Sequence, residues 1–310
     1  MSNGKHAIID EVKKVIVGKD DIIRKVFTVI LADGHILLED VPGVGKTTMA
    51  LAFSKAMGLD CKRIQFTPDT MASDVVGFSV YNKATASLEF KKGAAFCNLL
   101  LADEINRTSS KTQSALLEVM EERRVTVDGN TYDLPAPFIC IATQNPTGSA
   151  GTQNLPDSQL DRFMVRLSMG YPSVENQIEI IKARSDKDPI SEVCAVADQE
   201  GLLEMKNEAA KVFASDEMIA YCAVLCEATR VHDSVELGVS PRAVLALVRM
   251  AKANAYLNDR DFIVPDDIRD VFIDVCAHRL ILKPYARIKS ESASNVLDGI
   301  LKNTAAPKVS

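Results

Sequence analysis

A glycine-containing loop followed by Lys-Thr is the stretch of this chain best suited to chemistry. Residues 35–53 read HILLEDVPGVGKTTMALAF, which we interpret as an apolar strand, a loop with Gly43 and Gly45, and a helix that opens at Lys46 and Thr47. The backbone N–H groups of such a loop and the positive end of the helix dipole bind anions. The lysine adds a point charge for the outer phosphates, and the threonine hydroxyl can bind Mg²⁺. The stretch therefore predicts a nucleotide phosphate site.

The glycine pattern of this loop is incomplete, so the prediction needs independent support. Asp40 stands where the pattern G-x-x-x-x-G-K-[ST] has its first glycine. Residues 99–104, LLLADE, supply the support, because they form an apolar strand that ends in two carboxylates. The last residues of a parallel strand face the crevice where ligands bind. Asp103 can therefore reach a magnesium ion beside Thr47, and Glu104 can orient a water molecule toward the γ-phosphate.

A third polar position follows another apolar strand. Gln144 and Asn145 lie at the carboxyl end of the run Phe138–Thr143. A polar amide at that place can hold the attacking water or sense the γ-phosphate. Asn-Pro is also a common turn pair, so a simple turn at Asn145-Pro146 remains the alternative interpretation.

The elements that must position these side chains alternate up to about residue 170 and then change. The expected strands are short apolar runs: His35–Glu39, Lys62–Phe66, Asn98–Asp103, Phe138–Thr143 and Met164–Ser168. Such runs alternating with helices predict a parallel sheet with right-handed crossovers. Beyond Tyr171-Pro172 only helical patterns remain, at 174–184, 196–212, 215–230, 240–257 and 265–280. We therefore expect an α/β domain over residues 1–172 and an all-helical domain over residues 173–310.

Two segments interrupt the α/β alternation. Residues 74–96 are β-prone, spaced by glycines and too long for a plain loop. Residues 123–134 carry Asp-Gly between two alternating segments, which predicts a hairpin. Ser110 and Gln113 have the spacing of a capping box at the start of the helix before that hairpin.

Composition and charge exclude several classes of protein. The formal net charge of −6 over 310 residues disfavours a generally basic nucleic-acid-binding protein. No run approaches about eighteen apolar residues, so we expect no membrane span. The charged start MSNGKHAIIDEVKK does not resemble a secretory signal, so we expect a cytoplasmic protein. The seven cysteines show no zinc-binding spacing and are expected to be buried and reduced.

Five motifs in a fixed order carry a resemblance to a known family. They are Gly45-Lys46-Thr47, LLLADEINR with Asp103-Glu104, ATQNP with Asn145, LPDSQLDRF with Arg162, and GVSPRA with Arg242. Together they resemble the AAA+ ATPases, and specifically the MoxR branch of the helix-2-insert clade. The resemblance covers nearly the whole chain, from Ile16-Val17-Gly18 to the VPDDI helix. Asp40 departs from the general AAA+ loop but is compatible with the EDVPG form often seen in this branch.

The resemblance implies a fold, cofactors and partners. The fold is a P-loop domain whose parallel strands, numbered along the chain, lie in the order 5-1-4-3-2, followed by a small helical lid. Residues 74–96 resemble the helix-2 insert and residues 123–134 the pre-sensor hairpin. The implied cofactors are ATP and Mg²⁺. The implied assembly is a homo-oligomeric ring, expected to be hexameric, that acts on a protein partner, for which a von Willebrand factor A domain protein is suspected.

The resemblance also implies a role for each matching residue. The nucleotide would be bound by the segment near adenine and by the Walker A loop: Val17, Gly18, Pro42, Gly43, Val44, Gly45, Lys46, Thr47 and Thr48. The Walker B residues are Asp103, which with Thr47 would bind magnesium, and Glu104, which would activate water. Asn145 matches sensor 1. Arg162 matches the arginine finger that reaches a neighbouring subunit's nucleotide, and Arg242 matches sensor 2, which reads the γ-phosphate from the lid.

Alternatives remain open for the arginines and for the function. Arg162 could instead be a structural partner of Asp157 or Asp161, and Arg166 could be the finger. The leading hypothesis is an ATP-driven remodeller of partner proteins. The rival hypotheses are a DNA-associated motor, which the acidic charge disfavours, and a nucleotide-dependent scaffold that does not hydrolyse ATP. A small-molecule kinase fits poorly, because the helical lid and Arg162 would have no role in it.

Overall fold

The structure is a computed structural model that describes residues 2–41, 43–145, 155–186 and 188–307. The predicted nucleotide residue Pro42 lies outside the described residues. The central strands are β1 (Ile36–Glu39), β2 (Cys61–Gln65), β5 (Leu99–Asp103), β8 (Ile139–Gln144) and β9 (Val165–Leu167). The helices that precede residue 173 are α1 (Ser2–Lys13), α2 (Asp20–Leu31), α3 (Lys46–Ala56), α4 (Ala72–Val76), α5 (Ser110–Glu122) and α6 (Asp157–Leu160).

The five central strands form one parallel sheet in the order β2-β5-β8-β1-β9. Numbered along the chain, this is the predicted order 5-1-4-3-2, and the predicted α/β fold is confirmed. Strands β1, β5 and β8 are buried nearly throughout, which is why they appear in the sequence as continuous apolar runs. Ile36 and Leu38 of β1 pack in the core that holds α1, α2 and α3, whereas Leu37 packs on the α5 side.

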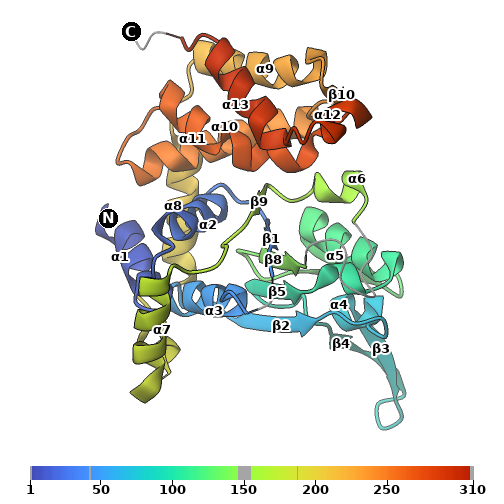
Figure 1. The fold of residues 1–310 in the computed structure, drawn as a ribbon. Helices are drawn as coiled ribbons and strands as arrows, with labels where there is room; N and C mark the ends of the chain where they lie inside the picture. The colour runs from blue at the N-terminus through green and yellow to red at the C-terminus, as the bar shows by residue number, and fades with distance from the viewer. Residues whose placement is uncertain (1, 42, 146–154, 187, 308–310) are drawn as a thin grey trace.

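Two β-hairpins extend from the sheet domain near α4 and α5 (Figure 1). One joins β3 (Gly77–Asn82) to β4 (Ser87–Lys92), and the other joins β6 (Arg124–Val127) to β7 (Asn130–Asp133). Phe90 of the first hairpin stacks on Tyr132 of the second, with ring centroids 4.1 Å apart. The two insertions, which residues 97–122 separate in the sequence, therefore form one unit, and its second hairpin begins where α5 ends.

The helix α5 starts one residue earlier than its sequence pattern suggests. Ser109 is its N-cap, and its side chain accepts a hydrogen bond from the backbone N–H of Thr112 at 3.3 Å. The capping box expected at Ser110 and Gln113 is wrong. The Gln113 amide is buried and donates instead to the backbone carbonyl of Ile105, at 3.0 Å. Gln113 thereby fixes the start of α5 to the turn that follows β5.

The second half of the chain is mainly helical. Its helices are α7 (Val174–Asp186), α8 (Gln199–Lys211), α9 (Asp216–Val231), α10 (Pro241–Leu257), α11 (Pro265–Cys276), α12 (Pro284–Ile288) and α13 (Ala293–Asn303). The expectation of an all-helical lid needs a correction, because β10 (Val235–Leu237) and β11 (Ile281–Leu282) form a small antiparallel ribbon. In Figure 1, α9 to α13 lie above the sheet, whereas α7 lies apart from them, beside α1 and α3. The domain boundary near residue 172 stays a prediction.

The buried side chain of Arg279 connects the lid to the sheet domain. Arg279, in the 3-10 helix Ala277–Arg279 after α11, has a side chain that is 2% exposed. Its Nε donates to Asp161 Oδ1 at 2.6 Å, and its Nη atoms donate to the carbonyls of Phe163 at 2.7 Å and Met164 at 3.1 Å. Ser240, the N-cap of α10, also donates to Asp161, at 3.0 Å. The lid is therefore anchored to the segment between α6 and β9.

In the ranges that the structure describes, no helix has the length and apolar character needed to cross a membrane.

Candidate active site

The loop between β1 and α3 has the geometry of a phosphate cradle. Gly43 has φ +86° and Gly45 has φ +98°, which are left-handed conformations that favour glycine. Gly45 is the N-cap of α3, so the first N–H groups of that helix face the loop. Lys46 is the first residue of the helix, and its Nζ donates to the backbone carbonyl of Asp40 at 2.7 Å. The lysine is thus held across the mouth of the loop.

Burial of Lys46 sets the electrostatics of this loop. The side chain is buried, and burial lowers the pKa of its ammonium, while the nearby carboxylates of Asp40, Asp103 and Glu104 oppose the shift. Asp40 directly follows β1, Asp103 is the last residue of β5, and Glu104 directly follows β5. The ends of these two strands therefore bring the three carboxylates to the same end of the sheet. A phosphate chain at this edge would meet one fixed cation and, through a metal ion, one fixed carboxylate.

A cavity of about 460 Å³ adjoins the cradle. Its walls include Val17, Gly43, Val44, Gly45, Thr48, Met169, Tyr171 and Ile180. The predicted adenine-side residue Val17 therefore lies with the loop. Gly18 has φ +68°, and a Cβ atom at this position would stand 1.8 Å from the side-chain nitrogen of Asn176 in α7. Gly18 lets α7 close against the α1–α2 turn, so α7 covers the cavity.

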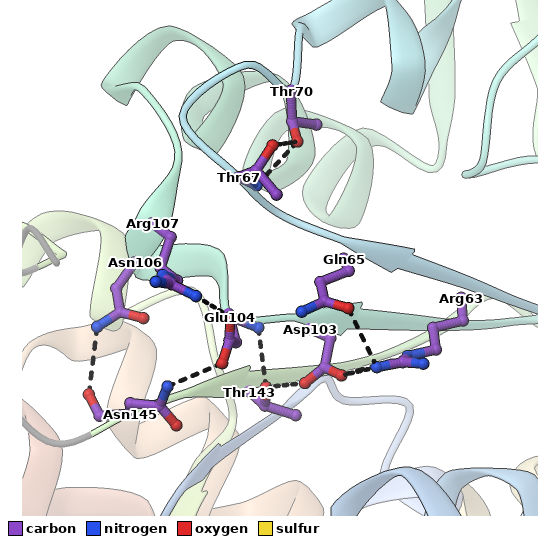
Figure 2. A network of polar contacts seen from close by, with 10 residues as sticks. All are labelled: Arg63, Gln65, Thr67, Thr70, Asp103, Glu104, Asn106, Arg107, Thr143 and Asn145. Carbon is purple, nitrogen blue, oxygen red and sulfur yellow. Dashed lines mark hydrogen bonds and ion pairs between the residues drawn. The ribbon is translucent and has the colours of Figure 1, made fainter. Parts of the chain in front are cut away.

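Asp103, the predicted magnesium ligand, has its two carboxylate oxygens held by two neighbouring strands (Figure 2). Its Oδ1 accepts a hydrogen bond from Thr143 Oγ1 in β8 at 2.5 Å. Its Oδ2 accepts from Arg63 in β2, at 2.7 Å from Nη2 and 3.2 Å from Nε. The Arg63 guanidinium therefore lies where it compensates the charge of Asp103.

Glu104, the predicted water activator, lies one residue beyond the strand in a left-handed conformation with φ +59°. Its backbone N–H donates to Thr143 Oγ1 at 2.9 Å. Asn145 Nδ2 donates to one carboxylate oxygen at 2.9 Å, and Arg107 Nη1 donates to the other at 2.9 Å (Figure 2). Burial raises the pKa of Glu104, but these donors outweigh it and hold the pKa below its usual value, so the group is ionised at neutral pH.

The residues at this edge fit a magnesium ion by the chemistry of their donors. Asp103 offers a carboxylate, and Thr47, in the first turn of α3, offers a hydroxyl. Mg²⁺ prefers such oxygen ligands and completes its shell with water and substrate phosphates, so a dedicated protein cage is not required. In the ranges that the structure describes, no cluster of three or more His, Cys, Asp or Glu able to hold a metal occurs.

Asp40 has a structural role that the sequence did not reveal. Its Oδ2 accepts hydrogen bonds from Ser168 Oγ at 3.0 Å, from the Met169 N–H, and from the Gly170 N–H at 2.9 Å. All of these donors belong to the segment that leads from β9 to α7. Asp40 is buried, and its carboxylate makes these hydrogen bonds to donors of the protein itself.

Arg162 and Arg242 lie together, away from the phosphate cradle. Arg162 Nη1 binds Glu121 Oε2 at 2.9 Å, and Arg242 Nη2 binds Glu121 Oε1 at 2.5 Å. The three side chains line a cavity of about 270 Å³ that also contains His35 and Arg249. This cavity lies where β1 and β9 begin, since the N–H of Met164 donates to the His35 carbonyl. The cradle lies beyond the opposite ends of the same parallel strands, roughly 13 Å away along β1.

The structure shows an ion-pair partner for each of these arginines, while the choice of Arg162 or Arg166 as the finger stays a prediction. Asp161, considered as a partner of Arg162, pairs with Arg279 instead. Arg166, considered as the finger, lies in β9 and binds Glu39 Oε2 of the neighbouring strand β1 at 3.1 Å. Arg162 is thus the arginine that lies beside the lid and beside Arg242.

Sequence reasoning missed five residues of this constellation: Arg63, Thr143, Arg107, Glu121 and the Asp40 carboxylate. The signal for Thr143 was available, because Thr143 precedes Gln144-Asn145 on a strand next to β5. Arg63 would follow only from the parallel pairing of β2 with β5. In that register Gln65 is opposite Asp103, and Arg63 lies two residues before Gln65 on the same strand. Glu121 carries no local signal, because both of its partners come from distant parts of the chain.

Comparison with family models agrees with this geometry. Residues 35–165 match the model described as "ATPase family associated with various cellular activities (AAA)", and residues 227–300 match an AAA lid domain. The first segment contains β1, the cradle, β5 and β8. The second contains the end of α9, all of α10, α11 and α12, and most of α13.

Similar proteins extend the agreement over nearly the whole chain. The chain is 45% identical to the uncharacterized protein YeaC of Bacillus subtilis, covering 96% of this chain and 93% of that protein. It is 38% identical to the chaperone MoxR1 of Mycobacterium tuberculosis, covering 97% and 82%. A crystal structure of a candidate ATPase from Cytophaga hutchinsonii superimposes with a TM-score of 0.93 at 39% identity, covering 99% and 96%. The chain belongs to the MoxR family of AAA+ ATPases.

Proposed function

We propose that this protein hydrolyses ATP at a composite site shared by two subunits of a ring. One observation carries the proposal: Arg162 and Arg242 share the Glu121 carboxylate near the start of β1, whereas Lys46 lies beyond the end of that strand. Both guanidinium groups pair with Glu121, roughly 13 Å along β1 from the cradle of their own subunit. In a ring, the face that carries Arg162 and Arg242 would meet the cradle of the neighbouring subunit.

The roles of the residues in the cradle follow from their contacts. Lys46 would exchange its hydrogen bond to the Asp40 carbonyl for the outer phosphates. Glu104 is ionised and held by Asn145 and Arg107, so it can accept a hydrogen bond from the attacking water and later its proton. Mg²⁺ bound by Thr47 and Asp103 would neutralise phosphate charge. The sites of Val17 and Thr48 on the adjoining cavity suit them to contact the rest of the nucleotide.

The arginines would act on charge that develops during the transfer. Arg162 and Arg242 present two guanidinium groups that now have a single carboxylate between them. The phosphates of a neighbour's ATP carry more negative charge than Glu121 and would compete for both groups. An arginine finger supplied in this way typically raises the rate by ~10³–10⁵. Arg242 would then serve a neighbour's nucleotide, not the nucleotide of its own subunit.

We further propose that hydrolysis drives chaperone-like remodelling of partner proteins. The support is the 38% identity to a protein named chaperone MoxR1 and the absence, in the motifs found, of a protease or nuclease centre. The ring is expected to be hexameric, the partner a von Willebrand factor A domain protein, and the compartment the cytoplasm; these follow from the family resemblance alone.

Turnover per subunit tests the composite site. We expect ATPase activity per subunit to rise with protein concentration as rings form, and Arg162→Ala to abolish the rise while ATP binding is retained. Arg166→Ala is the matched comparison, since Arg166 is the alternative finger and pairs with Glu39 of β1; we expect it to keep the rise, and loss of the rise in this variant alone would assign the finger to Arg166. Concentration-independent turnover by a demonstrated monomer would contradict the proposal.

Two measurements separate the rival functions. Phosphate release by Glu104→Gln, equal to that of the wild type, would favour a scaffold that does not hydrolyse ATP. DNA-stimulated ATPase activity that falls steeply with salt would favour a DNA motor. We expect neither result. A pull-down with the Glu104→Gln variant in ATP would identify the partner.

A further inference from the structure

Asp40 touches three parts of the nucleotide site at once. Its backbone carbonyl accepts the hydrogen bond of Lys46 Nζ at 2.7 Å. Its backbone N–H donates to the carbonyl of Gln144, at the end of β8, at 3.2 Å. Its carboxylate oxygen Oδ2 receives the donors of Ser168, Met169 and Gly170. A glycine, which stands here in the general loop pattern, would keep the two backbone contacts and lose the third set.

The segment held by this carboxylate forms part of the cavity beside the cradle. Met169 and Tyr171 line that cavity, together with Gly43, Val44 and Gly45 of the loop. The side chain of Met169 also lies against the loop, because a Cβ atom at Gly45 would be 3.8 Å from the Met169 methyl carbon. The same segment continues through Pro172 into α7, which covers the cavity.

We propose that Asp40 is a positioning residue that fixes the wall of the nucleoside pocket to the phosphate loop. A glycine at position 40 would leave the loop unconnected to this wall. The Asp40 carboxylate connects it, because the same residue accepts from Lys46 through its backbone carbonyl and from the N–H groups of Met169 and Gly170 through its side chain. The inference rests on the proposed nucleotide site and goes beyond it, because it assigns the departure from the loop pattern to binding of the adenosine half. The phosphate half is served by backbone atoms that any residue at position 40 provides.

The competing interpretation is electrostatic. A carboxylate near the cradle would repel phosphates, and its removal would then strengthen the binding of every phosphate ligand. The two interpretations differ for a neutral residue that keeps the acceptor. Since the three donors all reach Oδ2, the amide oxygen of an asparagine can take its place, so Asp40→Asn removes the charge and keeps the connection.

The experiment measures binding of two ligands by calorimetry in the presence of Mg²⁺, with wild type, Asp40→Asn, Asp40→Gly and Ser168→Ala. The ligands are ADP, which has the nucleoside, and tripolyphosphate, which lacks it. We expect Asp40→Gly to weaken ADP binding about tenfold, the equivalent of one net hydrogen bond, and to change tripolyphosphate binding less than about twofold. Asp40→Asn should bind both ligands like the wild type. Ser168→Ala removes one donor only and should weaken ADP binding by a smaller factor.

Several outcomes would overturn the inference. Tighter binding of both ligands by Asp40→Asn and Asp40→Gly would show that the charge matters and the connection does not. Equal loss of ADP and tripolyphosphate affinity in Asp40→Gly would show that the residue shapes the phosphate loop alone. ADP affinity of Asp40→Gly equal to that of the wild type would also overturn it. Failure of the wild-type protein to bind ADP would overturn the proposed nucleotide site itself. The titration of the wild type with ADP therefore separates this failure from a failure of the role proposed for Asp40.

Discussion

Arg162 and Arg242 come from different parts of the chain and bind the two oxygens of one carboxylate, Glu121. Arg162 follows α6 in the sheet domain, and Arg242 lies in the first turn of α10 in the lid. A cation in the first turn of a helix faces the positive end of its dipole, which is unfavourable. Glu121 compensates both guanidinium groups, and in the proposed ring the nucleotide of a neighbouring subunit would compete with it for them.

Mixing two inactive variants should restore hydrolysis. Arg162→Ala subunits keep an intact cradle, whereas Glu104→Gln subunits keep both arginines. In a mixed ring, some Arg162→Ala cradles face the arginines of Glu104→Gln subunits, so we expect phosphate release that neither variant gives alone. The measurement is steady-state phosphate release against the mixing ratio. Pairing Arg162→Ala with Arg242→Ala subunits is the control, because every interface then contains at most one intact member of the arginine pair. Activity no greater than the sum of the separate variants would count against the composite site.

Removal of Arg63 should strengthen metal binding. The guanidinium binds Asp103 Oδ2 at 2.7 Å and therefore competes with a metal ion for that carboxylate. We expect Arg63→Met to raise the affinity of the ADP complex for Mn²⁺ several-fold, measured by the electron paramagnetic resonance signal of free Mn²⁺. Lys62→Met, the neighbouring cation on the same strand, should change this affinity little. A weaker Mn²⁺ affinity in Arg63→Met would mean that the arginine positions Asp103 for the metal and does not compete with it.

The Thr143 hydroxyl should matter for both stability and turnover. It is completely buried, donates to Asp103 Oδ1 at 2.5 Å and accepts from the Glu104 N–H at 2.9 Å. Thr143→Val keeps the shape and leaves both partners unpaired. We expect this to lower the free energy of unfolding by about 1–3 kcal/mol and to reduce turnover at least about tenfold. Denaturant unfolding and kcat check the two effects.

A serine at the same position provides the test of mechanism. Thr143→Ser keeps the hydroxyl and should restore most of kcat. Thr126→Val, which removes an exposed hydroxyl bonded to Thr131 at 3.1 Å, should leave both quantities near their wild-type values. If Thr143→Val turned over ATP like the wild type, the network around Glu104 would not contribute to its positioning.

Stability should fall as the pH drops through the range of His35. Its Nδ1 accepts a hydrogen bond from the Cys140 N–H at 3.0 Å, so Nε2 carries the hydrogen and donates to the Met120 carbonyl at 2.9 Å. Burial lowers the pKa of this imidazole from its ordinary value of 6.5 to about 4. Because the unfolded chain binds the proton more readily, the contribution is complete above pH 6.5 and is lost as the pH falls toward 4. It amounts to roughly 3 kcal/mol.

Urea unfolding at a series of pH values measures this loss. His278 is also buried with a pKa well below 6.5, so it adds to the slope in the same direction. His35→Gln keeps a donor for the Met120 carbonyl and should flatten the dependence in part, and the double variant with His278→Gln should flatten it further. An unchanged slope in the double variant would contradict the assignment.

Arg279 should be a main determinant of the joint between lid and sheet domain. Its side chain is buried and donates to Asp161 and to the carbonyls of Phe163 and Met164. We expect Arg279→Met to destabilise the protein by about 3–5 kcal/mol, since it leaves Asp161 and these carbonyls unpaired. Arg279→Lys should rescue little, because one ammonium cannot match the fork of donors. Thermal unfolding and limited proteolysis around residues 161–164 would measure the effect.

The parts of the fold that could be predicted from sequence are those with a local pattern. Strands such as β1, β5 and β8 are buried on both faces, so their apolar runs mark them, and the carboxylates that end β5 mark the site edge. The ribbon of β10 and β11 could not be predicted, because strands of three and two residues carry no period.

The missing parts of the site depend on which segments become neighbours. Arg63 is one polar residue in a strand, and its meaning depends on the pairing of β2 with β5. Glu121 resembles any acidic residue near a helix end until the fold brings Arg162 and Arg242 to it. Asp40 was visible as a departure from the loop pattern, but its partners are 128 to 130 residues away. Such long-range contacts leave no trace in local spacing.

The helix α5 gives these contacts a mechanical meaning. It starts shortly after the turn that carries Glu104, Asn106 and Arg107, and its last turn carries Glu121, which binds the two arginines. Thirteen residues make a rod about 20 Å long between these ends. If the subunits assemble as proposed, one end of this rod senses the phosphates of its own subunit and the other end sets the cations offered to the next. Each helix would then couple the nucleotide state of one site to the arginines offered to the next site, so that hydrolysis around the ring would occur in sequence.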